Sequence, residues 1–310
     1  MKMPRVQRYE NIRSAAKEDL KSLFEEVEIN IDPSKVSKIT LIEGVPYYSQ
    51  EKENSCGFAN LRMILNYFGA KTREEDLYTF AKVIMVGYED DYGTYPLELA
   101  LIASQAIKEM ELELYIDGWI SMSLNPLMEE LMSQAQSMNN IKIHDFIEIC
   151  RSYIPILEKE LRTELKPVCK ENLPPWDLPF KPFWSRLSYE EKLDVANDFV
   201  YRINLLDRLV QNENCNLHFD YREWENRLKI CKESLENGIP FLMGLHFHWW
   251  TVIGYMDIEL GDNSTKNWVV PALIMYNSAA KGKSKYEVRI YFRNTTSMGD
   301  ILIIRPKKYW

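Results

Sequence analysis

The sequence lacks the long apolar runs and the excess of positive charge that are typical of membrane proteins and nucleic-acid-binding proteins. No stretch approaches the roughly 18 uninterrupted apolar residues that a spanning helix requires. The formal net charge of the 310 residues is −8, so the chain has no overall attraction for a polyanion. We therefore expect neither a membrane nor a nucleic acid as a partner.

A secretory signal and a disulfide framework are also missing. The N-terminal segment is charged and has neither an apolar core nor a small-residue cleavage site, which predicts a cytoplasmic protein. The cysteines are odd in number and irregularly spaced, so free thiols are expected. They are Cys56, Cys150, Cys169, Cys215 and Cys231. Cys215, His218 and Cys231 offer only three ligands where structural zinc needs four, so we expect no metal and no cofactor.

The composition that remains is that of a globular protein, with 46% hydrophobic and 27% charged residues. Helical periodicity is followed by strand-like alternation, which begins after Gly238, and a proline-rich segment at 167–182 is predicted to be extended. The first two predicted helices cover 9–27 and 55–69. The next two begin at a capping box from Thr72 to Glu75 and at Pro96. Four more cover 123–138, 143–165, 187–213 and 219–237.

A run of strands after a run of helices predicts an α+β fold. The simplest organisation has three parts. Residues 1–110 form a helical half, residues 111–235 form a large helical insertion, and residues 236–310 form an antiparallel β-sheet half. We find no internal repeat and no low-complexity segment.

Cys56 is the candidate nucleophile. It stands at the first turn of a predicted helix, where the partial positive charge of the helix N-terminus lowers the pKa of a thiol. Gly57 follows it and would let a substrate carbonyl approach the backbone closely. The alternative is a small apolar residue at a helix start. As a site residue, Cys56 is expected to be partly exposed.

Two histidines are candidate bases. His248 opens a predicted strand, and a histidine with a pKa near neutrality can hold a thiolate as an ion pair and later protonate a leaving group. His246 points to the same face of that strand, and periodicity does not choose between them. The aromatic residues Trp249, Trp250 and Tyr276 could line a substrate groove, although aromatic side chains on strands more often belong to the core.

Two amide side chains could complete such a site. Gln50 lies in the loop before Cys56, and its amide could donate to the oxyanion of a tetrahedral intermediate. Asn277 ends the strand after the histidine and could accept from the imidazole, which fixes the tautomer and orientation of the ring. The alternatives are a solvated loop glutamine and an ordinary turn asparagine.

These residues lie in segments that resemble a known family. The segment VPYYSQEKENSCGFANLRMILNYFG resembles the nucleophile segment of papain-like peptidases related to the bacteriocin-processing (double-glycine leader) peptidases. Three later segments, GTYPLELALIASQ, NGIPFLMGL and HWWTVIGY, resemble further blocks of that family in the same order. The similarity covers residues 42–110 and 236–280. The helical insertion between these parts explains why the interval from Cys56 to His248 is longer than is usual in the family.

The resemblance implies a papain-like cysteine peptidase fold, with Cys56 as nucleophile, Gln50 as oxyanion donor and His248 rather than His246 as base. The third catalytic position of the family is usually an Asp followed by Pro, whereas here Asn277 precedes Ser278. Asn takes this place in papain itself.

The functional prediction is a soluble cysteine hydrolase, a peptidase or amidase, that forms an acyl-enzyme thioester with a peptide or small amide. One alternative is an acyl or peptidyl transferase that uses the same triad. Another is a catalytically silent peptide-binding module. The oligomeric state does not follow from the sequence.

Overall fold

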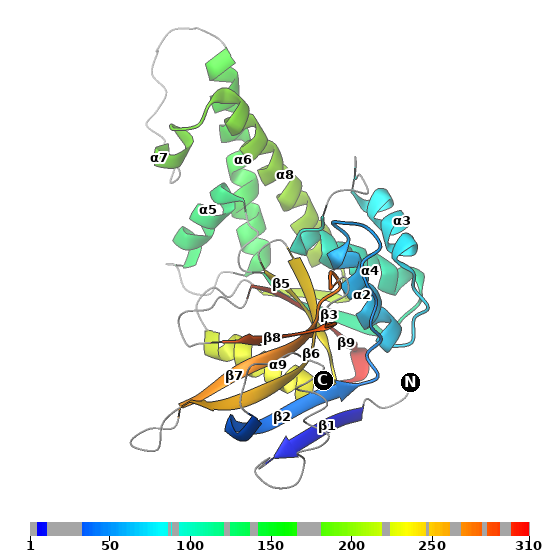
Figure 1. The fold of residues 1–310 in the computed structure, drawn as a ribbon. Coiled ribbons are helices and arrows are strands. Elements are labelled where there is room, and N and C mark those ends of the chain that lie inside the picture. Colours follow the sequence, from blue (N-terminus) through cyan, green and yellow to red (C-terminus); the bar gives the residue numbers. More distant parts are fainter. Residues whose placement is uncertain are drawn as a thin grey trace.

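The computed structural model describes residues 5–10, 33–85, 88, 93–120, 125–136, 142–165, 181–218, 224–245, 248–260, 268–280, 284–291 and 299–309. Helices and one β-sheet alternate along this part of the chain, so the predicted α+β class is confirmed. Figure 1 shows the sheet at the centre, with helices on several sides of it.

The described strands form a single nine-stranded sheet. They are β1 (Arg5–Glu10), β2 (Val36–Glu43), β3 (Leu114–Trp119), β4 (Cys215–His218), β5 (Phe241–Leu245), β6 (His248–Leu260), β7 (Trp268–Tyr276), β8 (Tyr286–Ile290) and β9 (Asp300–Pro306). The order is β1-β2-β6-β5-β9-β3-β4. Off this path, β7 pairs with β6 and with β8. The pairs are antiparallel, except that β3 runs parallel to β4.

Some of the described helices lie beside this sheet and others project from it (Figure 1). The α-helices are α2 (Cys56–Tyr67), α3 (Glu74–Ile84), α4 (Pro96–Glu109), α5 (Pro126–Gln136), α6 (Ile143–Leu165), α7 (Lys181–Trp184), α8 (Tyr189–Val210) and α9 (Trp224–Glu236), and 3₁₀ turns cover Pro33–Lys35 and Lys307–Tyr309. Within the described residues, no helix combines the length and the apolar character that crossing a bilayer requires.

Both faces of the sheet are covered by apolar cores, as alternation along β9 shows. Ile301 and Ile303 join a core formed with β2, β6, β7 and α9, whereas Leu302 and Ile304 join a core formed with α2, α4 and α8. Successive strand residues point to opposite faces, so a strand that is apolar throughout is buried on both. Helix α2 packs against β6 from the second of these cores, which brings its N-terminus to the sheet.

Most elements agree with the sequence prediction. The strands β5 to β9 fall where alternation predicted them, α6 has the predicted bounds, and α4 begins at Pro96. The capping box of α8 is confirmed, because the backbone N–H of Ser188 donates to Glu191 Oε2 at 2.8 Å and the backbone N–H of Glu191 donates to Ser188 Oγ at 3.3 Å.

Several local predictions are wrong. The capping box of α3 lies one residue later than predicted, since the backbone N–H of Arg73 donates to Asp76 Oδ2 at 2.8 Å. Tyr9 and Glu10 belong to β1 rather than to a helix, and 11–27 lie outside the described residues. Lys181 and Pro182 begin α7 rather than continuing an extended segment, whose residues 167–180 lie outside the described part.

The region 111–235 also contributes strands that the sequence did not reveal. Strands β3 and β4 lie in this region and pair within the sheet, with β3 hydrogen-bonded to β9. Helices α6 and α8 pack side by side and, with α5, extend away from the sheet (Figure 1). The central region of the sequence therefore supplies both a group of projecting helices and two strands of the sheet.

Candidate functional site

Cys56 is the first residue of α2, as predicted, but its side chain is buried, with 6% of its surface exposed. The prediction of a partly exposed thiol is wrong because Cys56 belongs to the buried core that α2 forms with α3, α4 and Trp249 of β6. Burial raises the pKa of the thiol above its usual value, and this outweighs the opposing effect of the backbone N–H groups of Trp249, Gly57 and Cys56 itself, which favour the thiolate. The helix start alone therefore does not make this thiol acidic.

The start of β6 lies next to α2. Trp249 is the second residue of β6, directly after His248, and the Nδ2 of Asn60 on α2 donates to its carbonyl oxygen at 2.8 Å. The first turn of α2, which begins at Cys56, therefore lies against the start of the strand that carries the candidate base.

His248 is half-buried at the start of β6 and contacts Asn277, which follows β7. His248 Nε2 lies 3.2 Å from Asn277 Oδ1, and the backbone N–H of Ala279 donates to the same oxygen at 2.9 Å. An amide oxygen is only an acceptor, so Nε2 carries the proton and Nδ1 is the ring nitrogen left for the sulfur. The ring of Trp250 meets the imidazole edge-on, with centroids 4.5 Å apart.

The pKa of His248 is lowered by burial, which disfavours the charged imidazolium. The hydrogen bond to Asn277 and the negative charge of Glu287 act in the opposite direction. Burial thus favours a neutral thiol and a neutral imidazole when each is taken separately. A thiolate–imidazolium pair would form here only because the two charges stabilise each other.

Asn60 connects the two sides of the site, and the sequence prediction missed it. It is fully buried one turn after Cys56, and its Nδ2 lies 2.8 Å from the Cys56 carbonyl oxygen, 2.8 Å from the Trp249 carbonyl oxygen and 3.0 Å from Ser278 Oγ. Thr251 donates its hydroxyl to Asn60 Oδ1 at 2.8 Å. The only sequence signal is a polar residue among the apolar positions of a buried helix.

Gln50 lies beside the same network, but its amide donors are engaged. Its backbone N–H donates to the Ser278 carbonyl at 3.0 Å, and its Nε2 donates to the carbonyls of Lys52 at 2.9 Å and Glu53 at 2.5 Å. The side chain therefore folds back onto the loop that leads into Cys56. To reach a substrate oxyanion, Nε2 would have to exchange one of these two bonds.

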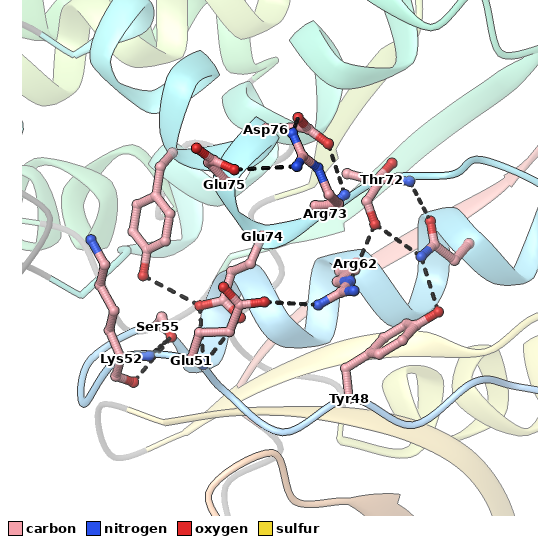
Figure 2. A network of polar contacts seen from close by, with 12 residues as sticks. Tyr48, Glu51, Lys52, Ser55, Arg62, Thr72, Arg73, Glu74, Glu75 and Asp76 are labelled. Carbon is pink, nitrogen blue, oxygen red and sulfur yellow. Dashed lines mark hydrogen bonds and ion pairs between the residues drawn. The ribbon is translucent and has the colours of Figure 1, made fainter.

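A buried carboxyl group is hydrogen-bonded to that loop, and the sequence prediction did not identify it. The side chain of Glu74 is fully buried, and its Oε2 accepts from the Glu51 backbone N–H at 3.2 Å, while Oε1 accepts from the Tyr78 hydroxyl at 3.3 Å (Figure 2). The Ser55 hydroxyl donates to the Lys52 carbonyl at 3.0 Å in the same loop. Burial raises the pKa of Glu74, and its charge contributes to the raised pKa of Cys56.

The backbone packs tightly at Gly57. A Cβ atom placed there would lie 2.0 Å from Thr94 Oγ1, so any side chain at this position would require Thr94 to move. Thr94 is held in turn by Trp249, whose indole Nε1 donates to the Thr94 carbonyl at 3.0 Å. Trp249, Trp250 and Tyr276 are all buried, so in this structure these aromatic residues belong to the core rather than to an open groove.

The remaining candidates do not gather at this site. His218 stacks on Trp119 and contacts Asn216 at 2.9 Å, while Cys215 and Cys231 belong to different cores. Within the described part of the chain, no three His, Cys, Asp or Glu side chains form a group that could hold a metal ion. His246 and Cys169 lie outside the described residues.

A comparison with protein-family models now identifies the segment that carries Cys56. Residues 44–103 match the model of the Peptidase C39 family. This segment is that of a C39-like cysteine peptidase. The match confirms the predicted resemblance to the bacteriocin-processing family, and it supports a function of the cysteine peptidase kind.

The C39-like segment includes Gln50, Cys56, Asn60 and Glu74, whereas His248 and Asn277 lie beyond it. Searches of the curated proteins and of the solved structures found no match to the chain. The histidine side of the site therefore rests on its geometry.

Proposed function

We propose that the protein is a cysteine hydrolase of papain-like architecture that cleaves peptides or other amides, with Cys56 as nucleophile, His248 as base and Asn277 as the residue that orients the base. The observation that carries the proposal is the bridge made by Asn60, whose Nδ2 donates to the carbonyl oxygens of Cys56 and Trp249 at 2.8 Å each. It holds the residue next to His248 against the helix turn that begins with Cys56. The C39-like character of the segment around Cys56 supports the same chemistry.

The reaction would begin with transfer of the thiol proton from Cys56 to His248 Nδ1. The thiolate attacks the substrate carbonyl carbon, and the oxyanion accepts from the Cys56 backbone N–H and from the Gln50 amide. The C–N bond then breaks as the imidazolium protonates the leaving amine. Water, deprotonated by His248, hydrolyses the thioester and restores the thiol.

Peptide-resolved alkylation tests the pair without knowledge of the substrate. The rate of iodoacetamide addition to Cys56 should exceed that of a free thiol near neutral pH, because an ion-paired thiolate is present below the normal thiol pKa. His248→Ala should remove this excess. Equal rates for the two proteins would refute the proposal, and the buried Cys150 serves as an unreactive internal control because burial raises its pKa to about 12.

A silent peptide-binding module is the second candidate, and one observation favours it. The thiol is buried and the Gln50 amide is bonded within its own loop, which is the geometry of a site without turnover. Screening a peptide library by mass spectrometry separates the two candidates. Cleavage by the wild type but not by Cys56→Ala supports the hydrolase, whereas binding without cleavage by both supports the module. Products that carry an added amine would indicate acyl transfer.

We also propose that the projecting helices of 111–235 are an insertion in a papain-like domain. The packing of α5, α6 and α8 on one another supports this division. Strands β3 and β4 belong to the sheet, so the insertion is restricted to the helices between them. Proteolysis within this region that leaves Cys56 reactivity intact would support it, and loss of reactivity on cleavage would contradict it.

A further inference from the structure

One acidic side chain, that of Glu287, lies behind the proposed triad and takes no part in the reaction steps proposed for it. Glu287 lies on β8, and its Oε2 accepts from Asn277 Nδ2 at 3.2 Å and from Trp250 Nε1 at 2.9 Å. Asn277 in turn contacts His248 through its other amide atom, Oδ1. The carboxylate is therefore one hydrogen-bonded residue away from the imidazole.

Two bonds fix the orientation of the Asn277 amide. The Ala279 N–H donates to Oδ1 and Nδ2 donates to Glu287, so a flipped amide would face a donor with its own donor and a carboxylate with its oxygen. Only the observed orientation presents an acceptor to His248 Nε2. Glu287 thus determines which amide atom meets the base.

A neutral asparagine does not supply a negative charge to stabilise a protonated His248. Formation of a thiolate–imidazolium pair places a positive charge on a half-buried ring, and an amide oxygen stabilises this charge through its dipole alone. An acidic residue behind the asparagine supplies the missing negative charge. The indole of Trp250, which lies edge-on to His248, is held by the same carboxylate.

We infer that Glu287 is a positioning residue of the proposed hydrolase, which orients the Asn277 amide and supplies the negative charge that stabilises the imidazolium of His248. The inference rests on the proposed function. Asn277 and Glu287 together then orient the imidazole and stabilise its charge, as a single carboxylate in contact with the ring would do. The reactivity of Cys56 is therefore coupled to a side chain on a third strand.

Other ionisable groups surround this relay and set its electrostatic balance. On β8, the Arg289 guanidinium lies 6.0 Å from the Trp250 ring centroid, and Lys285, just before β8, lies with its Nζ 4.8 Å from the Tyr286 ring centroid. Tyr47 donates its hydroxyl to the Asn277 carbonyl at 3.0 Å. On the nucleophile side, the charge of Glu74 acts on Cys56. Arg289 and Lys285 are thus the cations on or next to the strand that carries Glu287, and their charge is opposite to its own.

The test measures the alkylation rate of Cys56 by iodoacetamide in the whole protein. Glu287→Gln keeps the size of the side chain and removes its charge. We expect the rate near neutral pH to fall about 3-fold to 10-fold, equivalent to roughly 0.5 to 1 pKa unit of lost ion-pair stability. At a pH above the raised pKa of the Cys56 thiol, the thiolate forms without help from the imidazolium, so wild type and variant should react within about 2-fold of each other.

Charge transposition provides the second arm of the test. The double variant Asn277→Asp with Glu287→Gln returns a carboxylate to the site, now directly beside His248 and supported by an amide. We expect it to recover the near-neutral rate that Glu287→Gln loses. A merely structural role would lower the rate at both pH values and would not be rescued. The exposed Glu113, paired with Lys308 at 3.5 Å, gives the matched control Glu113→Gln, which should react like wild type.

The outcomes separate the inference from the proposal beneath it. If wild-type Cys56 shows no excess reactivity that depends on His248, the proposed function fails. If that excess is present and Glu287→Gln retains it, the proposed function stands and the inference is overturned. A loss in the single variant that the double variant does not restore also overturns the charge role.

Discussion

The two sides of the candidate site are built over different distances along the chain. On the nucleophile side, Gln50 bonds carbonyls two and three residues away, and Asn60 bonds the Cys56 carbonyl four residues back. On the histidine side, His248 contacts Asn277 29 residues later, and Asn277 contacts Glu287 on a third strand. The first side contains a local motif, to which Gln50 and Asn60 add long-range bonds with Ser278 and Trp249, whereas the second exists only once the sheet has formed.

The family match covers the nucleophile side alone. A loop and helix with short-range contacts keep a compact pattern in the sequence, and residues 44–103 match the C39 model. The histidine side depends on the register of β6, β7 and β8, where Thr251 pairs with Tyr276 and Tyr276 pairs with Tyr286. Changes to either side should therefore have distinguishable consequences.

The largest effect is expected from His248→Ala. Without the base, the near-neutral alkylation rate of Cys56 should fall at least about 100-fold, within the range that general bases contribute. His218→Ala, at the far end of the sheet, should leave the rate unchanged. A His248→Ala protein that reacts like wild type would show that the nucleophile side is active without the histidine side.

Asn60→Ala tests the residue that joins the sides. It removes buried hydrogen bonds to Cys56, Trp249 and Ser278, so we expect a loss of about 2 to 4 kcal/mol in the free energy of unfolding, measured with urea. Asn237→Ala removes an exposed bond to the Glu233 carbonyl and should cost no more than about 0.5 kcal/mol. Equal losses for the two variants would mean that the junction contributes no special stability.

Asn277→Ala weakens the histidine side without removing the base. The imidazole loses the acceptor that fixes its tautomer, so the Cys56 alkylation rate near neutral pH should fall about 10-fold to 100-fold. Asn216→Ala provides the control, because Asn216 contacts His218 at 2.9 Å in a similar pair elsewhere in the sheet. If both variants react like wild type, the asparagine has no role in the reactivity of the thiol.

The smallest effect concerns Glu74 on the nucleophile side. Its pKa is raised by burial, so the folded state holds this proton more tightly than the unfolded chain does. Stability contributed by the protonated group is therefore lost as pH rises through its folded pKa. Glu74→Gln cannot ionise, and the stability of this variant relative to wild type should increase as the pH rises above about 4, the pKa of the carboxyl group in the unfolded chain. A difference that does not change with pH would contradict the raised pKa.

The sequence predicted the fold class and most elements because helical and strand periods record which faces are buried. It did not reveal β3 and β4, which lie among helices and find their partners only in the assembled sheet. The site prediction brought together Cys56, His248 and Asn277, but it missed Asn60, Glu74 and Glu287. These three residues carry no motif, since their roles depend on which distant atoms reach them.

The exposure of Cys56 was predicted wrongly for a related reason. Position at a helix start is a property of the local sequence, and Cys56 has it. Burial depends on what packs over that start, and Cys56 belongs to a core that includes Trp249 of β6. The pKa of Cys56 is consequently raised where the local pattern predicted that it would be lowered.

The sequence by itself determined the α+β class, the C39-like nucleophile segment and the candidates Cys56 and His248, because periodicity and short motifs are contained within single elements. Only the tertiary structure decided that Asn60 joins the two sides, that the thiol is buried and that Glu287 stands behind Asn277. The physical reason is that hydrogen bonding and desolvation act between atoms that meet only after the helix α2 has packed on the sheet.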